Sequence, residues 1–268
     1  MENDDGLARL FFELASESRL GILRALQARA LRMQEIAQKL DLTDTETCRQ
    51  LQRLSEGQLI QKQPDGTYSM TQYGKLELEL TSAQDFVHRN KDYFLKHDVF
   101  ALPYEFVNRL GELSTGEFSR DTLGTLNRVR RMVYEAEEYI WVIADEVDSS
   151  HVEITNAKIS EGLKLKFIMP KKLVQTVKFT PEMLLCPRCR KQIVEDEKAF
   201  KAKGCGYCER RQLEEICLSL FINEKTVCVS LRRIGDVMDY AAFFGQDEKF
   251  RKWSQDIFLH YWEKAERW

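Results

Sequence analysis

The sequence predicts a protein of mixed α+β and α/β class, with an N-terminal winged helix-turn-helix, a helical connector and a C-terminal α/β domain. Residues 31–71 read as two helices and a hairpin, residues 139–169 as strand, helix and strand, and residues 186–208 hold two Cys-x-x-Cys pairs. A chain of 268 residues, 43% of them hydrophobic, can bury one or two cores. The expected parts are a winged-helix domain over 1–80, a connector over 81–117 and an α/β domain over 118–268.

Helical periodicity and turn chemistry predict the helix-turn-helix. Ile36, Ala37 and Leu40 recur at helical spacing, which gives the first helix one apolar face. The short turn over 41–44 supplies aspartate and threonine oxygens that can cap a following helix. A second helix is therefore expected over 45–56, and a glycine directly after it marks its end.

The second of these helices has one apolar and one polar face. Leu51 and Leu54 point toward the first helix, so the opposite face is left for a partner. This face and the hairpin that follows supply the candidate DNA-binding residues, which are Thr45, Glu46, Arg49, Gln50, Arg53 and Lys62. Helix spacing puts Arg49 and Gln50 deepest in a groove, where we expect base contacts. Arg53 and Lys62, the other two cations of the set, are expected to contact phosphates.

Two short strands, over 59–60 and 68–70, flank a polar tip at residues 63–66 that ends in Asp-Gly. An Asp-Gly pair between short apolar segments is typical of a β-hairpin. A helix pair with such a wing is used to hold one helix in a DNA groove. An ordinary helical hairpin beside a β-hairpin has the same periodicity, so the pattern by itself leaves both interpretations open.

The residues of this region resemble those of ArsR-like winged-helix regulators. Residues 40–54 (LDLTDTETCRQLQRL) resemble their recognition segment, and residues 11–26 (FFELASESRLGILRAL) resemble their opening helices. The resemblance implies a transcriptional regulator that binds double-stranded DNA at a specific sequence. It also implies a homodimer that reads a roughly palindromic operator.

The charge of the N-terminal region argues against strong non-specific DNA binding. Residues 1–80 carry 10 Lys and Arg against 13 Asp and Glu, a balance of −3. Affinity for phosphates in general should be weak, and binding must depend on a local basic patch. The acidity keeps a second hypothesis open, in which the chain is a zinc-stabilised protein-interaction scaffold without an operator of its own.

Four cysteines form the second strong motif. Cys186, Cys189, Cys205 and Cys208 make two Cys-x-x-Cys pairs with 15 residues between them, a spacing that presents four thiolates to one Zn²⁺. We expect one zinc ion per chain, held in a zinc-ribbon insertion over 170–212. A structural role, a redox-sensing role and iron held as in rubredoxin are the three alternatives.

The other three cysteines are predicted to be isolated. Cys217 and Cys228 lie in alternating apolar runs and are expected to be buried, small apolar side chains. Cys48 lies on the predicted DNA-facing helix, where oxidation would block docking, although a lone helical cysteine is more often only a space-filler.

Residues 94–113 (FLKHDVFALPYEFVNRLGEL) resemble the opening of the effector domain of archaeal methanogenesis regulatory proteins. The resemblance extends over almost the whole chain, and it implies an archaeal regulator whose C-terminal domain senses a ligand, a metal or a redox state. The four-cysteine insertion departs from that family's pattern, which puts an inherited ligand in doubt. His97 and Asp98 read either as a catalytic couple or as a polar pair that fixes the turn after a helix.

The C-terminal part has a clear α/β pattern. A helix over 120–136, a strand over 139–144, a helix over 147–162 and a strand over 163–169 predict a right-handed βαβ unit with parallel strands. Three further elements are expected to complete this domain, namely strands over 216–221 and 226–231, which form a hairpin, and an aromatic helix over 249–262. The aromatic side chains of that helix are expected in the core or at a dimer contact.

Enzyme motifs are absent from the sequence. The βαβ pattern is similar to a phospholipase D half-domain, but each of the four histidines lacks the lysine two residues later that this chemistry needs. No phosphate loop, nucleophile elbow or dinucleotide motif occurs, so we expect no enzyme. No run approaches the ~20 apolar residues of a membrane span, and the acidic start differs from a secretory signal, so a cytoplasmic protein is expected.

Overall fold

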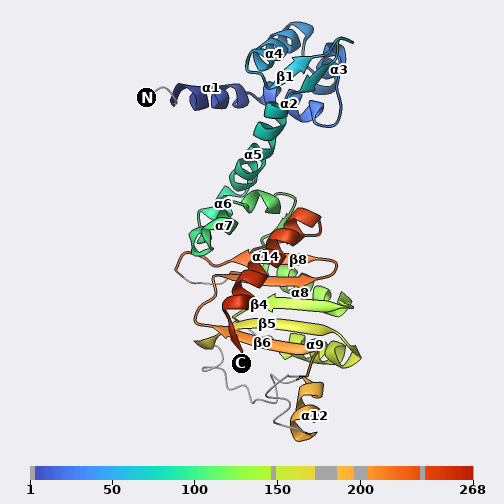
Figure 1. The fold of residues 1–268 in the computed structure, drawn as a ribbon, viewed down its shortest axis with the longest axis vertical. Coiled ribbons are helices and arrows are strands. Elements are labelled where there is room, and N and C mark those ends of the chain that lie inside the picture. The colour runs from blue at the N-terminus through green and yellow to red at the C-terminus, as the bar shows by residue number, and fades with distance from the viewer. Residues whose placement is uncertain (1–3, 146–148, 173–185, 196–204, 236–238, 268) are drawn as a thin grey trace. The chain divides into compact units, whose positions relative to one another are not determined.

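The computed structural model describes residues 4–145, 149–172, 186–195, 205–235 and 239–267. The chain divides into two compact units, unit 1 over Met1–Gln84 and unit 2 over Asp85–Trp268. The boundary falls within one helix, α5 (Gln72–Arg89), which is therefore the covalent link between them (Figure 1). Among the described residues, no helix is both long and apolar enough to cross a membrane.

Unit 1 contains the predicted helices and hairpin. Its elements are α1 (Asp4–Leu14), α2 (Glu17–Leu26), α3 (Met33–Leu40), α4 (Asp44–Glu56), β1 (Ile60–Lys62), β2 (Tyr68–Met70) and the start of α5 (Figure 1). The two strands pair antiparallel, with Ile60 opposite Met70. This arrangement of helices with a two-stranded wing confirms the predicted winged helix-turn-helix.

Local interactions fix the ends of these elements. The side chain of Thr43 accepts a hydrogen bond from the backbone N–H of Glu46 at 3.2 Å and so caps α4. Asp41 ends α3 in the left-handed conformation, with φ of 53°. Gly66 has φ of 83° at the tip of the wing, a conformation that favours glycine. The core beneath is apolar and includes Ile22, Leu23, Ile36, Leu51, Leu54, Leu59 and Ile60.

The start of α5 is held closely against unit 1. The Thr71 hydroxyl accepts a hydrogen bond from the backbone N–H of Gly74 at 2.9 Å and caps the helix. A Cβ added to Gly74 would lie 2.0 Å from the carbonyl oxygen of Leu59. The backbones approach so closely that only glycine fits, and this contact fixes the direction in which α5 leaves the unit.

Unit 2 is built around a large mixed sheet. Before the sheet come the end of α5, α6 (Lys91–Phe94), η1 (Val99–Ala101), α7 (Tyr104–Val107) and η2 (Leu110–Leu113). The other elements are β3 (Glu117–Ser119), α8 (Thr122–Glu135), β4 (Tyr139–Ile143), α9 (Ser149–Glu161), β5 (Lys164–Pro170), α12 (Pro187–Glu195), β6 (Cys208–Leu213), β7 (Leu218–Asn223), β8 (Val227–Leu231), β9 (Ala242–Gly245), α14 (Glu248–Lys264) and β10 (Glu266–Arg267).

The strand order is β10-β6-β5-β4-β7-β8-β9-β3. Strands β4, β5 and β6 run parallel, with Ile140 opposite Leu165 and Leu165 opposite Cys208. The remaining pairs are antiparallel. The predicted parallel pair joined by a helix and the predicted hairpin β7–β8 are therefore confirmed. The short strands β3, β9 and β10 were not predicted.

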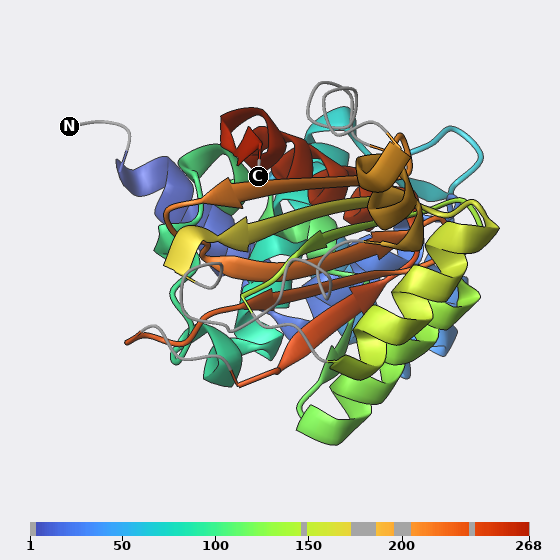
Figure 2. The same ribbon diagram turned by 90° about the horizontal axis from the view of Figure 1, so that it is seen from below.

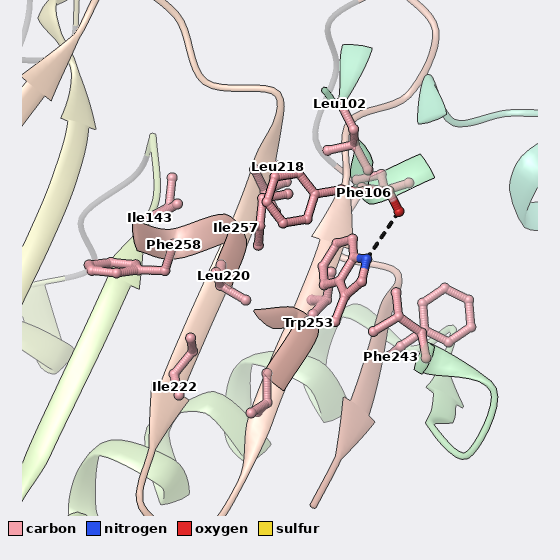
Figure 3. Close-up of a cluster of buried hydrophobic side chains, with 14 of the residues drawn as sticks. Leu102, Phe106, Ile143, Leu218, Leu220, Ile222, Phe243, Trp253, Ile257 and Phe258 are labelled. Carbon is pink, nitrogen blue, oxygen red and sulfur yellow. Dashed lines mark hydrogen bonds between the residues drawn. The ribbon is translucent and has the colours of Figure 1, made fainter. Parts of the chain in front are cut away.

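Helices cover both faces of the sheet. Figure 2 shows α8 and α9 on one face and α14 on the other. Because side chains alternate along a strand, Ile140 and Val142 lie under α8 and α9, whereas Ile143 lies in the cluster with α14. Figure 3 shows this second cluster, in which the Trp253 indole N–H donates to the carbonyl oxygen of Phe106 at 3.1 Å. The closing helix is therefore a core element, as predicted.

One prediction about the middle of the chain needs correction. A ribbon inserted at a sheet edge was expected over 170–212, but Cys208 begins β6, which lies inside the sheet between β5 and β10. Cys186 directly precedes helix α12, and Cys189 lies in its first turn. The described part of this segment is thus a helix and a sheet strand. The stretch over 173–185 lies outside the described residues.

Replacing Gly74 by alanine should destabilise unit 1. The added Cβ must displace the carbonyl of Leu59, which is backbone, so we expect a loss of about 2 kcal/mol or more in unfolding free energy. Gly6→Ala is the control, since nothing lies within 4 Å of a Cβ there. Thermal unfolding of both variants checks this, and equal melting temperatures would contradict the close approach.

Candidate nucleic-acid interface and metal centre

Helix α4 presents one polar face outside the core of unit 1. Leu51 and Leu54 are buried, with exposed fractions of 1% and 0%, and pack among α2, α3 and the wing. Thr45, Cys48 and Arg49 are exposed on the other side of the helix. The Arg49 side chain is 68% exposed, which makes it the cation of α4 that is most accessible to a DNA groove.

The cations of α4 are paired with carboxylates in this structure. Arg49 donates to Glu46 at 2.6 Å, one helical turn earlier. Arg53 donates to Glu13 of α1 at 2.7 Å and 3.3 Å. The Arg53 side chain is 41% exposed whereas that of Glu13 is 12% exposed, so the carboxylate is the buried partner. A phosphate would have to replace Glu13 as the acceptor for Arg53.

Gln50 differs from its predicted role. Its side chain is buried, with 4% exposed, and its amide oxygen accepts a hydrogen bond from Arg19 at 2.9 Å. Its amide nitrogen donates to Glu46. With both ends of the amide engaged inside the unit, Gln50 positions α4 and does not present an edge to a base.

Arg19 of α2 was not predicted as a site residue. It is 6% exposed, and it donates to the carbonyl oxygens of Phe12 and Glu13, each at 2.6 Å, as well as to Gln50. Its sequence signal is its spacing, because Arg19 lies in line with Ile22 and with the other buried positions of α2. An arginine in an apolar stripe indicates a buried cation that needs several acceptors.

Lys62 lies at the end of β1, on the wing. Its side chain is exposed, and its Nζ lies 5.9 Å from the centre of the Tyr68 ring on the neighbouring strand. No carboxylate within 4.0 Å of its Nζ is seen among the described residues. Of the cations in the predicted set, Lys62 is therefore the one best placed to bind a phosphate without breaking an ion pair.

The candidate metal centre lies where α12 meets the sheet. Cys186 directly precedes α12, and its sulfur accepts a hydrogen bond from the backbone N–H of Cys189 at 3.3 Å, as an N-cap side chain does. Pro187 is the first residue of the helix, a position that proline favours. Cys208 is the first residue of β6 and pairs with Leu165. A helix start and a strand start therefore hold the two ends of the motif.

The sulfur atoms of the four cysteines gather in one place. Those of Cys186, Cys189 and Cys208 all lie within 4.8 Å of one another, and all three residues are buried. Cys205 joins them, with its Sγ 3.7 Å from that of Cys186, while Cys186 and Cys189 are 3.3 Å apart. Zn–S bonds of about 2.3 Å in a tetrahedron separate sulfurs by roughly 3.8 Å. The cluster is thus of the right size for a metal ion.

The ionisation of the cluster favours a cation. Hydrogen bonds with the sulfurs of Cys189, Cys205 and Cys208 lower the pKa of Cys186 far below its ordinary value of 9.0. The same contact raises the pKa of Cys208 to about 12, since this thiol is the donor and is buried. Neighbouring sulfurs cannot all be thiolates without a compensating positive charge, and a divalent cation supplies it.

The surroundings tie the first pair of cysteines to the domain. Arg188 donates to the carbonyl oxygen of Ser160 in α9 at 2.8 Å, and its guanidinium lies 4.1 Å from the centre of the Tyr207 ring. Tyr207 directly precedes Cys208. The residues around the sulfurs therefore connect helices α9 and α12 with strand β6.

The remaining candidate residues lie outside the cysteine cluster. Cys48 is exposed on α4, and Cys228 is buried at 3% exposure. The sulfur of Cys217 contacts the Tyr261 hydroxyl at 2.9 Å. The ring of His97 is buried between the carbonyl oxygen of Tyr93, at 2.7 Å, and the carboxylate of Asp239, at 3.1 Å. These partners agree with the structural interpretation of the histidine.

Comparisons with known proteins give one family match and several distant folds. Residues 8–91 match the family model described as the HVO_A0261 N-terminal domain. TrmBL2, an archaeal chromatin protein, is similar at 15% identity and a TM-score of 0.41, over 94% of each chain. Nuc, a phospholipase D family member from Salmonella typhimurium, has 10% identity and a TM-score of 0.39, over 53% of this chain and 90% of that one. NucT from Helicobacter pylori has 11% identity and a TM-score of 0.38, over 57% and 100%. No curated protein matches the sequence.

The Glu13–Arg53 pair should make the stability of unit 1 depend on pH. The hydrogen bonds from Arg53 lower the pKa of Glu13 below its ordinary value of 4.5. A lowered pKa contributes stability that is present above 4.5 and is lost as the pH falls through the lower, folded-state value. Glu13→Gln should therefore flatten the acid side of the stability profile.

Melting temperatures from neutral pH down to about pH 3 measure this effect. Glu17→Gln is the matched control, because Glu17 is exposed at the start of α2. Parallel pH profiles for Glu13→Gln and the unmutated chain would contradict the role given to the pair.

Proposed function

We propose that this chain is a sequence-specific DNA-binding transcriptional regulator that inserts α4 into the major groove. The observation that carries the proposal is the placement of α4, whose apolar side is buried in unit 1 while Thr45 and Arg49 are exposed on the other side. The adjacent wing carries an exposed Lys62. A helix face of this kind beside a wing is the arrangement that winged-helix proteins use to read DNA.

In this proposal the residues of the interface have different roles. Arg49, the most exposed cation of α4, contacts a base edge, with Thr45 near the start of the helix beside it. Arg53 and Lys62 contact phosphates. Glu46 holds Arg49 and Gln50 in the absence of DNA and releases the arginine on binding.

The ion pairs of α4 do not prevent such binding. The side chains of Arg49 and Glu46 are 68% and 30% exposed, and a pair at this exposure contributes little to stability, so its exchange for a base oxygen costs little. When Arg53 leaves Glu13, which is 12% exposed, this carboxylate keeps its ion pair with Arg19 at 3.2 Å. Both ion pairs of α4 can therefore be exchanged. They do, however, lower the free positive charge of a region that already carries a balance of −3. Non-specific affinity should be low, and discrimination between sequences should be high relative to it.

The cysteine cluster is assigned one Zn²⁺ per chain in a structural role. Four thiolates leave no open position for a substrate, and the cluster joins α12 to β6. Unit 2 then acts as an effector domain that senses a ligand, the metal or the redox state, and not as an enzyme. Burial of His97 against Tyr93 and Asp239 supports this assignment, since both ring nitrogens are engaged.

DNA binding is tested with operator sites selected from a random duplex library, followed by anisotropy titrations in a salt series. Arg49→Ala should cost about 1–3 kcal/mol and relax the base preference. Lys62→Ala should weaken all sequences alike and lower the salt slope by about 1. Lys75→Ala is the charge-matched control, because Lys75 is an exposed cation of α5 outside the interface.

Two outcomes would contradict the proposal. Selection that yields no preferred sequence at any salt concentration favours the alternative hypothesis, a zinc-stabilised interaction scaffold. An Arg49→Ala variant that binds the selected operator with unchanged affinity would remove α4 from the interface.

Metal content is tested by elemental analysis of the purified chain. We expect one Zn²⁺ per chain, and we expect Cys186→Ser combined with Cys208→Ser to lose it. Cys228→Ser, a buried cysteine outside the cluster, should retain the metal. Stoichiometric iron would support the metal site but change the identity of the metal. An unmutated protein without metal would contradict the site.

Oxidation distinguishes a structural zinc site from a redox-sensing one. Mild peroxide should leave operator affinity intact, because the core of unit 1 contains none of the four thiols. Loss of binding that follows zinc release and recovers with reductant and zinc would show a redox sensor instead. Cys48→Ser is run in parallel, because it removes the one thiol on α4.

A further inference from the structure

Glu46 places a carboxylate among the residues that the proposed function assigns to DNA. It is the third residue of α4, directly after Thr45 and three residues before Arg49, and its side chain is 30% exposed. The N-terminal residues of a recognition helix are those that contact base edges. Phosphates repel a carboxylate, so Glu46 adds nothing to the general attraction between this helix and DNA. A favourable contribution from this side chain therefore requires a specific donor.

A series of hydrogen bonds from the core holds one oxygen of this carboxylate. The guanidinium of Arg19 donates to the amide oxygen of Gln50 at 2.9 Å, and the amide nitrogen of Gln50 donates to Oε1 of Glu46. Arg19 and Gln50 are buried, with 6% and 4% exposed. Because a guanidinium can only donate, Arg19 determines which end of the amide faces it and leaves the amide nitrogen for Glu46. The position of the carboxylate is thus fixed from inside unit 1.

The other oxygen of Glu46 is the one that can change partners. Oε2 accepts a hydrogen bond from Arg49 at 2.6 Å, and this bond is exposed, whereas the bond from Gln50 is partly buried. When Arg49 moves to a base, the bond from Gln50 keeps Glu46 in place and Oε2 loses its donor. An ionised carboxylate can only accept hydrogen bonds, so Oε2 then needs a donor from the DNA.

Cytosine is the base whose major-groove edge fits this oxygen. Its edge offers the N4 amino group as a donor and no acceptor, whereas guanine and thymine offer acceptors. Adenine offers a donor beside the N7 acceptor, and that edge suits an amide better than a carboxylate. Arg49 has the opposite preference, since its donors fit O6 and N7 of guanine.

The spacing of Glu46 and Arg49 limits the distance between the two bases. Residues three apart on a helix have Cβ atoms about 5–6 Å apart. Successive bases of one strand are about 3.4 Å apart along the duplex axis. The two side chains therefore reach the same base pair, or base pairs at most about two steps apart.

We infer that Glu46 is a specificity-determining residue that accepts a hydrogen bond from the N4 amino group of a cytosine, and that Gln50 and Arg19 are positioning residues for it. The inference rests on the proposed function, because it names a base that the interface of α4 reads. Attraction to cytosine and repulsion of bases that present acceptors both contribute to discrimination. The same carboxylate lowers non-specific binding, because phosphates repel it.

Glu46→Gln tests the carboxylate with little change in shape. The amide nitrogen of Gln50 requires an acceptor, so the new side chain turns its oxygen to Gln50 and puts its NH2 group where Oε2 was. A donor then faces the amino group of cytosine. In sites selected from a random duplex library, the unmutated chain should prefer cytosine at one position by about 5- to 150-fold. Glu46→Gln should lose this preference and favour a base that presents an acceptor.

Glu56→Gln is the matched control. It removes the same charge from an exposed carboxylate near the end of α4, whose partner is the amide of Gln52. Glu56→Gln should select the same bases as the unmutated chain, so only Glu46→Gln should change the operator sequence. Melting temperatures of both variants verify that unit 1 stays folded.

Gln50→Glu tests the positioning role. The new carboxylate keeps an acceptor for Arg19 but has no N–H for Glu46, and its charge repels that side chain. The preference for cytosine should fall at least about 5-fold, while the preference for the base that Arg49 contacts is retained. A loss of affinity that is equal for all sequences would show a structural role alone and would overturn the positioning role.

A base analogue tests the contact itself. In the selected operator the cytosine is replaced by 2-pyrimidinone, which has a hydrogen in place of the N4 amino group. The unmutated chain should bind this operator about 5- to 150-fold more weakly. The analogue also weakens pairing with guanine, so Glu46→Ala is measured on the same two operators and should lose far less. Equal losses for the two proteins would overturn the contact.

The outcomes separate this inference from the proposed function. If no duplex is preferred at any salt concentration, both fail. If Arg49→Ala relaxes the selected sequence while Glu46→Gln selects the same bases as the unmutated chain, the proposed function stands and the inference is overturned. The inference is also overturned if the position that Glu46→Gln changes is an A·T pair in the operator of the unmutated chain.

Discussion

The exposed face of α4 depends on one buried cation, Arg19. Its guanidinium satisfies the carbonyl oxygens of Phe12 and Glu13 at the end of α1 and the amide oxygen of Gln50 on α4. Removing it would leave the buried amide oxygen of Gln50 without this donor, at a cost of about 1–3 kcal/mol, and would also break the two part-buried bonds to the end of α1. Three helices are thus held by a single side chain, and the orientation of Arg49 and Arg53 follows from that arrangement.

The sequence predicted the elements of both units better than the roles of individual polar residues. Periodicity, the cap at Thr43 and the Asp-Gly tip depend on local physics, so the helices and the wing were found. Gln50 was misassigned because it lies at the border between the buried and the exposed face of α4. Its burial is decided by Arg19, which is 31 residues earlier in the chain, and helical spacing carries no information about such a partner.

The metal segment shows the same limit. The four cysteines were recognised by spacing, since Cys-x-x-Cys pairs are specific, but their secondary structure was not. Strand β6 (CERRQL) has no alternation of apolar residues, and other interactions hold it in the sheet. Arg211 lies 4.3 Å from the centre of the Trp262 ring and donates to the carbonyl oxygen of that residue. Cys208 lies among the metal-centre sulfurs. Such tertiary partners replace the apolar pattern by which strands are recognised.

The low positive charge of unit 1 limits how strongly one copy of the chain can bind DNA. One α4, whose two arginines are paired, together with the single lysine of the wing, gains little from phosphate attraction, so one copy alone should bind DNA weakly. Joining two copies makes the second contact intramolecular, which raises affinity without adding charge. Because the contact made by each copy is weak, a DNA site that matches in only one of its two halves is bound poorly. The acidity of unit 1 is therefore compatible with the proposed selective binding, provided that two copies act together.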